Sequence, residues 1–231
     1  MAQIAYLRTE QGRAAEIEAA GREQVRRYPH QPTWRAAFAR NLVGSGELAE
    51  ARLVIAPLIA RQFADIPIDR GWLATHALAA EVVAAIGDVQ AAEQLEVHLL
   101  PFAGRTIVLG SVIYYGPAEY FLGLLAVTCS RFDEAIAYFE TAIATGQRAG
   151  ARVFVSRSRL AFARALLARG GEGDGARAGR LVRSVLDVTE GRPFRAVAEE
   201  AREVGAALWR REPAGLPTRR RRGRSKKIIE S

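Results

Sequence analysis

The sequence predicts an all-α fold: a right-handed α-solenoid of antiparallel helix hairpins with a C-terminal capping helix and a disordered basic tail. Composition is the first reason, because alanine, leucine, arginine and glutamate dominate a chain of 231 residues that is 49% hydrophobic, and these residues favour helix. A repeated spacing of small residues is the second, and glycine and proline turn signals between helical stretches are the third. We assign the helical repeats to residues 1–211 and the tail to residues 212–231.

The first helical stretch opens at Gly12 and runs to about Tyr28, where Pro29 and Pro32 end it. It is typical of the second helix of a hairpin whose first helix is short or missing. This incomplete first hairpin predicts a chain that starts inside an array of hairpins.

Two complete hairpins follow. Helical periodicity predicts the first over Thr33–Ile59, broken at Gly44–Gly46, with Pro57 expected to kink or end its second helix. The second has its turn at Gly87-Asp88 and ends at Pro101. Each pair is too short to bury its apolar faces alone, so neighbouring pairs are required.

Two further hairpins and a final helix complete the array. The unit Gly116–Gly150 turns at Ser130–Phe132, and the unit that begins near Arg152 turns at Gly170–Gly175. A last helix over about Arg192–Trp209 is predicted to cap the exposed face of the final hairpin, as the end of a solenoid requires.

A spacing of 12 residues recurs between small residues of paired helices, as in Ala39 to Ala51, Ala80 to Ala92 and Gly123 to Ala135. Small side chains let two backbones approach closely, and an aromatic or aliphatic residue fills the space between them. The arrangement around Gly123 resembles a tetratricopeptide (TPR) hairpin, whose repeat is about 34 residues long. The residues predicted to pack the repeats are Ala39, Ala51, Ile55, Ala80, Ala92, Gly123, Ala135, Phe139, Ala142 and Ala178.

A narrower resemblance rests on short phrases and their order: Gly12-Arg13 with Tyr28-Pro29, Phe63–Pro67 with Trp72–Ala74, Leu99–Arg105, Leu122–Ala126, Arg131–Ala135 and Gly150–Arg152. Together they resemble the TPR-like C-terminal region of large bacterial signalling ATPases and LuxR-type transcriptional regulators, in which a cyclase or helix-turn-helix module and an ATPase module precede the repeats. The resemblance implies a sensor or scaffold role in bacterial signalling or transcriptional regulation. The sequence holds none of the preceding modules, and its arginine-rich end is not part of that pattern.

The residues that usually carry chemistry are dispersed. His30, His76 and His98 lie far apart on different expected elements, so no pair has metal-ligand spacing. Cys129 lies on an apolar helix and is expected to be a small buried side chain. The glycine run at Gly170–Gly175 follows a helix and lacks the closing Gly-Lys-Ser/Thr of a phosphate loop. We therefore predict no enzyme activity, no cofactor and no metal.

We predict a protein-interaction scaffold that binds a peptide or a partner domain in a concave groove lined by the first helices of the hairpins. The candidate groove residues are Arg35, Arg40, His76, Tyr114, Tyr115, Glu119, Arg157 and Arg159. A cytoplasmic location is expected, because the sequence has one cysteine, no signal peptide and no apolar run long enough to span a membrane. The sequence decides neither the partner nor the oligomeric state.

The alternative function is a nucleic-acid-associated transcriptional regulator that uses the tail. The basic tail residues are Arg219, Arg220, Arg221, Arg222, Arg224, Lys226 and Lys227; with Glu230 they give +6 of the formal net charge of +8 and leave +2 for the rest. Such a tail predicts weak, salt-dependent contact with nucleic acid that is blind to sequence. A solubilising or frameshifted end explains the same residues, and both interpretations stay open at this point.

Overall fold

The computed structural model describes residues 2–109, 113–190 and 194–211, and most of these residues are helical. The described part contains eleven α-helices, two short 3-10 helices and one two-stranded sheet. The mainly helical fold predicted from composition is confirmed. The predicted basic tail, with its seven arginine and lysine residues, lies outside the described residues.

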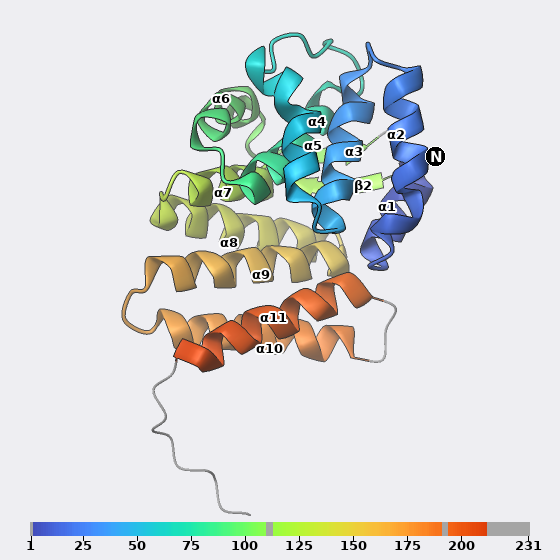
Figure 1. Cartoon of the computed structure of the whole chain (residues 1–231). Helices are drawn as coiled ribbons and strands as arrows, with labels where there is room; N and C mark the ends of the chain where they lie inside the picture. The colour runs from blue at the N-terminus through green and yellow to red at the C-terminus, as the bar shows by residue number, and fades with distance from the viewer. Residues whose placement is uncertain (1, 110–112, 191–193, 212–231) are drawn as a thin grey trace, which may run out of the picture.

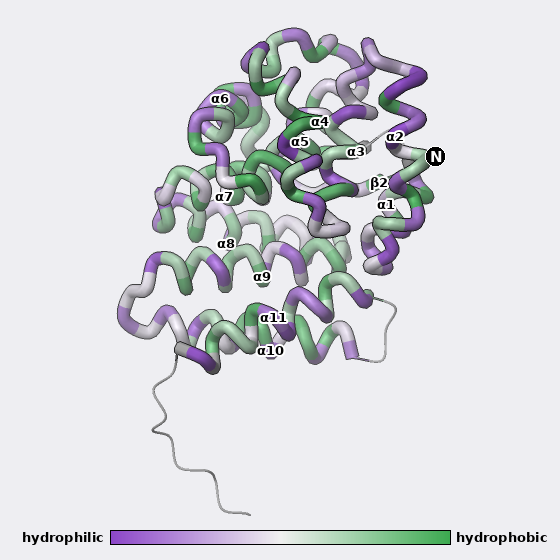
Figure 2. Tube along the Cα trace, viewed as in Figure 1, coloured by the Kyte–Doolittle hydropathy of each residue, from purple (hydrophilic) through white to green (hydrophobic). Residues whose placement is uncertain are grey.

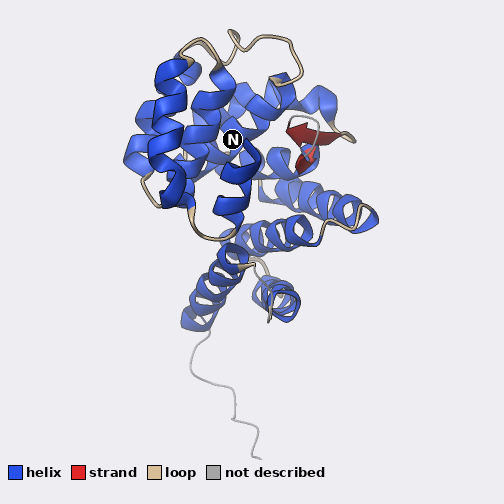
Figure 3. Ribbon diagram, turned by 90° about the vertical axis from the view of Figure 1, so that its right-hand side faces the viewer, coloured by secondary structure: helices blue, strands red, loops and turns tan. Residues whose placement is uncertain are grey.

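Consecutive helices joined by short turns lie side by side, from α2 at one end of the molecule to α10 and α11 at the other (Figure 1). Figure 3 shows the small sheet beside this stack of helices. The elements are α1 (Ala2–Glu10), η1 (Ala14–Ile17), α2 (Glu18–Arg27), α3 (Pro32–Gly44), α4 (Leu48–Ala60), α5 (Trp72–Ile86), α6 (Val89–Leu99), η2 (Leu100–Phe102), β1 (Thr106–Leu109), β2 (Ile113–Pro117), α7 (Ala118–Thr128), α8 (Phe132–Arg148), α9 (Arg152–Arg169), α10 (Asp174–Thr189) and α11 (Arg195–Arg211).

Local signals set most of the turns. Gly87 ends α5 in the left-handed conformation at φ +68°, and the Asp88 side chain accepts a hydrogen bond from Ala91 N at 3.1 Å to cap α6. Gly170 ends α9 in the same way, at φ +68°. Pro57 lies inside α4, and the helix continues to Ala60 before it ends.

Small residues line the contacts between helices. The ten residues predicted to pack the repeats are all buried. At Gly123 an added Cβ would lie 2.6 Å from the Phe139 ring, so α7 and α8 can approach this closely only because glycine has no side chain. In Figure 2 the apolar helix α5 is mainly green and the polar helix α2 mainly purple, which matches their inner and outer positions.

The N-terminus matches one of the two predicted alternatives, because the first helix is short and not missing. Residues Ala2–Glu10 form α1, and the helix predicted from Gly12 is divided into η1 and α2. Ile4 and Leu7 of α1 are each 54% exposed. The sequence of this helix also has no clear apolar face that would predict it. The turn after α1 touches α11, because an added Cβ at Gly12 would lie 3.6 Å from Glu199 Oε2.

The antiparallel hairpin of β1 and β2 is a small addition to the predicted helices. Its strands carry Thr, Ile, Val and Tyr, which favour extended backbone. Ile107 pairs with Gly116 and Val108 with Tyr114, so Tyr115 is the extra residue of a β-bulge. Gly116 has φ +112°, and an added Cβ there would lie 2.0 Å from the Phe154 ring. Only glycine fits that position.

Candidate functional site

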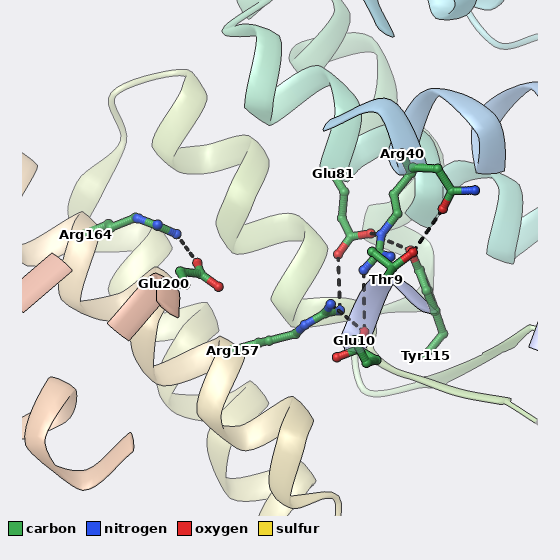
Figure 4. A network of polar contacts seen from close by, with 9 residues as sticks. Thr9, Glu10, Arg40, Glu81, Tyr115, Arg157, Arg164 and Glu200 are labelled. Carbon is green, nitrogen blue, oxygen red and sulfur yellow. Dashed lines mark hydrogen bonds and ion pairs between the residues drawn. The ribbon is translucent and has the colours of Figure 1, made fainter. Parts of the chain in front are cut away.

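Two glutamates and two arginines from four helices meet inside the molecule, and we call them the charge cluster: Glu10 (α1), Arg40 (α3), Glu81 (α5) and Arg157 (α9) (Figure 4). Arg40 Nε donates to Glu81 Oε2 at 3.1 Å, and Arg157 Nη2 lies 2.5 Å from Glu10 Oε1. Two longer ion pairs complete the set, Arg40 with Glu10 at 3.7 Å and Arg157 with Glu81 at 3.9 Å. Each arginine therefore contacts both carboxylates.

The cluster is almost closed to solvent. The exposed fraction of its side chains is 9% for Arg40, 10% for Glu10, and 13% for both Glu81 and Arg157. Isolated charges at such depth cost several kcal/mol each, and mutual pairing offsets that cost. Two positive and two negative side chains leave the cluster with no net charge.

Neighbouring polar groups add two hydrogen bonds in and beside the cluster. The Tyr115 hydroxyl on β2 donates to Glu81, and Thr9 Oγ1 donates to Asn41 Oδ1 at 3.1 Å (Figure 4). The Tyr115 ring stacks on Phe121 with centroids 5.5 Å apart. The β-bulge thus turns Tyr115 inward. The strand pair in this way places a hydrogen-bond donor against Glu81.

The ionisation of these groups follows from their surroundings. Burial alone would raise the pKa of Glu81, but Arg40 and Arg157 outweigh it, so this pKa is lowered. Burial opposes the charge on each arginine, yet the carboxylates raise both arginine pKa values. Burial and then Glu81 raise the pKa of Tyr115 well above its ordinary value. At neutral pH Glu81 is therefore ionised and Tyr115 is neutral.

An open hollow of about 500 Å³ lies next to the cluster between α1, α2, α3, α5 and β2, and we call it the α1–α3 groove. Arg40 and Tyr115 belong to both the cluster and the groove lining. The lining includes no histidine, cysteine or carboxylate among the described residues. Its larger apolar side chains are Ile4, Tyr6, Ile17, Trp34, Phe38, Leu78, Ile113 and Tyr115, and its polar ones are Gln3, Gln24, Gln31, Thr33, Arg40, Asn41 and Arg70.

The eight predicted groove residues do not form one surface. Arg40, Tyr115 and Arg157 meet at the charge cluster. Arg35 lines a different hollow and donates to the Val54 carbonyl at 3.4 Å. Arg159 is half-buried on α9 and lines neither hollow.

The other three predicted groove residues need correction. His76 is 0% exposed and Glu119 is 5% exposed, so neither side chain lines an open groove. Glu119 Oε1 instead accepts a hydrogen bond from Gly104 N at 2.6 Å and ties the loop before β1 to α7. Tyr114 lies on β2 and not on a first helix, and its ring meets Phe154 edge-on at 5.8 Å.

Two histidines that are distant in sequence come together. The rings of His76 and His98 lie 4.9 Å apart, and Trp72 contacts both. His76 Nδ1 donates to the Trp72 carbonyl at 2.8 Å, and burial lowers the pKa of His76 to about 4. Among the described residues no group of three or more His, Cys, Asp or Glu side chains can hold a metal ion.

Sequence reasoning missed Glu10 and Glu81, the two anions of the cluster. Glu81 follows the apolar run of α5, where a single carboxylate resembles an ordinary exposed position. Glu10 ends α1, a short helix whose residues were not predicted. The available signal was one arginine at an inward position of α3 and one of α9, because a buried arginine requires a buried carboxylate.

Comparisons with known proteins assign no family. No family model matches the chain, and no curated protein matches it. A solved structure, described as the crystal structure of BtubC (BKLC) from P. vanneervenii, is similar with a TM-score of 0.45 and 17% identity, covering 96% of this chain and 98% of that chain. This similarity is too low to support a conclusion about function. None of the described helices combines the length and the hydropathy needed to cross a membrane.

Proposed function

We propose that this chain is a TPR-like helical repeat module that binds a segment of a partner protein in the α1–α3 groove. The observation that carries the proposal is the open, largely apolar hollow of about 500 Å³, which is within the size range of ligand-binding clefts. The setting we propose is a cytoplasmic bacterial signalling or transcription-regulatory system, and the sequence phrases that resemble such regulators support it.

The lining favours an uncharged, apolar anchor in the bound segment. Trp34 and Phe38 of α3 and Tyr6 of α1 provide aromatic surface, and aromatic side chains contribute much of the binding energy at protein interfaces. The buried cation in the lining, Arg40, is already neutralised by Glu81 and Glu10. A charged anchor beside Arg40 would gain little and would lose its hydration.

The polar lining favours a bound segment in extended conformation. Gln3 and Gln31 are exposed and Gln24 is half-buried. Each amide side chain both donates and accepts hydrogen bonds, which matches the free N–H and C=O groups of an extended peptide backbone. A helical segment satisfies those groups internally and would leave the amides without partners.

The arrangement fits binding better than catalysis. Within the described residues the four charged groups of the cluster are paired with each other and shielded from solvent. The groove lining lacks a nucleophile with an adjacent base. We therefore propose an interaction role for this site and no reaction.

Selection from a phage-displayed library of random peptides of about 12 residues tests the proposal. Peptides enriched on the parent protein should share an apolar anchor. Ala20→Leu fills the groove from α2, and Ala19→Leu places the same side chain on the exposed side of the same helix. We expect Ala20→Leu to weaken the selected peptides about tenfold or more, a loss of about 1.4 kcal/mol, and Ala19→Leu to leave them unchanged.

Either of two results contradicts the proposal: no peptide is enriched, or the enriched peptides bind the two variants equally well. Circular dichroism of both variants verifies that the fold is intact. Because the substitutions are neighbours on one helix, a general loss of helix stability affects both, while a loss of groove binding affects Ala20→Leu alone.

The tail gives a second candidate function, a nucleic-acid-associated regulator. The observation in its favour is the concentration of +6 of the formal net charge in residues 217–231. Such binding should fall steeply with added salt, because released counterions drive it. Binding of a labelled DNA duplex at two salt concentrations, with and without residues 217–231, distinguishes it from groove binding.

A further inference from the structure

A second hollow lies between α10 and α11. These two helices lie at the opposite end of the stack from α2 (Figure 1). It has a volume of about 370 Å³ and shares no lining residue with the α1–α3 groove. We call it the α10–α11 groove. No described element covers it.

The floor of this groove is apolar, and its lining includes glycines that carry no side chain. Val182 is 3% exposed and Leu208 is 9% exposed, and both line it. At Gly179 an added Cβ would have Arg183 Nη1, at 4.0 Å, as its nearest neighbour, and at Gly205 it would lie 3.6 Å from Val182 Cγ1. The missing side chains leave room for another backbone to come close to both helices.

The edge of the groove is positively charged. Arg180, Arg183 and Arg202 line it, and in the described residues none of the three forms an ion pair. No described carboxylate belongs to the lining. On another side of α10, by contrast, Arg177 pairs with Glu140 of α8. With respect to the described part of the chain, the three arginines of the groove are therefore available to a ligand.

We propose that the α10–α11 groove binds an amphipathic helix of a partner protein, with an apolar stripe flanked by acidic side chains. Two adjacent helices with a shallow apolar seam accept a third helix by ridges-into-grooves packing. The acidic flank meets Arg180 and Arg183 of α10 and Arg202 of α11. Nucleic acid matches the arginines but offers no apolar stripe for Val182 and Leu208, so the floor favours a helix.

The test uses two synthetic peptides of about 18 residues, or five helical turns. One carries a leucine stripe flanked by glutamates, and the other has lysine in place of every glutamate. Fluorescence anisotropy measures their binding to the full chain. We expect the acidic peptide to bind at least about tenfold more tightly than the basic one. Equal binding, or no binding of the acidic peptide, overturns the proposal.

Variants locate the binding surface. Gly179→Leu fills the groove, meets only the flexible end of Arg183 at 4.0 Å and improves helix propensity. We therefore expect the protein to stay folded while acidic-peptide binding falls about tenfold or more. Arg180→Glu with Arg183→Glu should have the same effect, and Arg105→Glu, in an exposed loop elsewhere, should have none. Unchanged peptide binding in the first two variants overturns the proposal. The proposal is also overturned if a labelled DNA duplex outcompetes the acidic peptide and if the charge-reversed variant no longer binds that duplex.

Discussion

Glu81→Gln tests whether the charge cluster holds the helices together. Glutamine keeps the shape of the side chain and can still accept the hydrogen bond from Tyr115, so the change removes the charge and little else. Arg40 and Arg157 would then share the single carboxylate of Glu10. The interior would carry one uncompensated positive charge.

The expected loss follows from the geometry. Glu81 contacts Arg40 at 3.1 Å and Arg157 at 3.9 Å, and one such pair at about 4 Å is worth about 4 kcal/mol with an effective dielectric constant of about 20. Desolvation of the Glu81 carboxylate and its repulsion by Glu10 offset part of the summed attraction to the two arginines. Removing one partner of a buried ion pair costs about 3–5 kcal/mol. Because glutamine keeps its hydrogen bonds, we expect about 3 kcal/mol.

Urea unfolding followed by circular dichroism measures this free energy. Glu134→Gln is the matched control, because Glu134 is 40% exposed in its ion pair with Arg131, and exposed pairs contribute about 0–1 kcal/mol. If Glu81→Gln is no more destabilising than this control at neutral pH, the reasoning about the cluster is wrong.

The pH dependence gives a second test of the same variant. The pKa of Glu81 is lowered in the folded protein from an ordinary value of 4.5. Its contribution to stability is therefore complete above about pH 4.5 and is lost as the pH falls through the folded pKa. The difference between parent and Glu81→Gln should shrink below about pH 4.5. A difference that stays constant into acid would exclude the ionised carboxylate as its source.

Three further predictions concern packing, catalysis and the tail. Gly123→Leu and Ala135→Arg should each lower the unfolding free energy by roughly 2–4 kcal/mol, through overlap with Phe139 and burial of an unpaired charge; parent-like melting curves would contradict the hairpin packing. The purified chain should release no phosphate from ATP or GTP and form no cyclic nucleotide; turnover that is lost on mutating one of its own residues would contradict this. Deleting residues 217–231 should leave the melting temperature nearly unchanged and abolish salt-sensitive DNA binding.

Local sequence signals were sufficient for most of the helices. The turn at Gly87-Asp88 was predictable because a left-handed glycine and an N-cap aspartate act within a few residues. The strands β1 and β2 were missed because the segment is short and its decisive feature is a distant contact. Glycine is required at position 116 because any side chain there would overlap the Phe154 ring of α9. The residues next to Gly116 in the sequence do not indicate that contact.

The candidate site was less predictable than the fold. Arg40 and Arg157 were expected to face a ligand, and the structure pairs them with Glu10 and Glu81 instead. Ion pairs between distant helices have no period in the sequence, so single residues on different helices cannot be matched by pattern alone. The α1–α3 groove was missed because α1, which forms one wall, has Ile4 and Leu7 exposed and no amphipathic pattern.

The charge cluster and the α1–α3 groove are physically linked. Arg40 and Tyr115 contact Glu81 on one side and line the groove on the other. A buried ion cluster is weak evidence for stability, since apolar residues of similar volume often replace such pairs without loss. Our hypothesis is that the cluster fixes the relative positions of α1, α3, α5 and α9, because each arginine contacts carboxylates on two helices. Glu81→Gln should therefore weaken groove-binding peptides even under conditions in which the variant is fully folded, and Glu134→Gln should not. If peptide affinity is unchanged while stability falls, the cluster holds the helices together without shaping the groove.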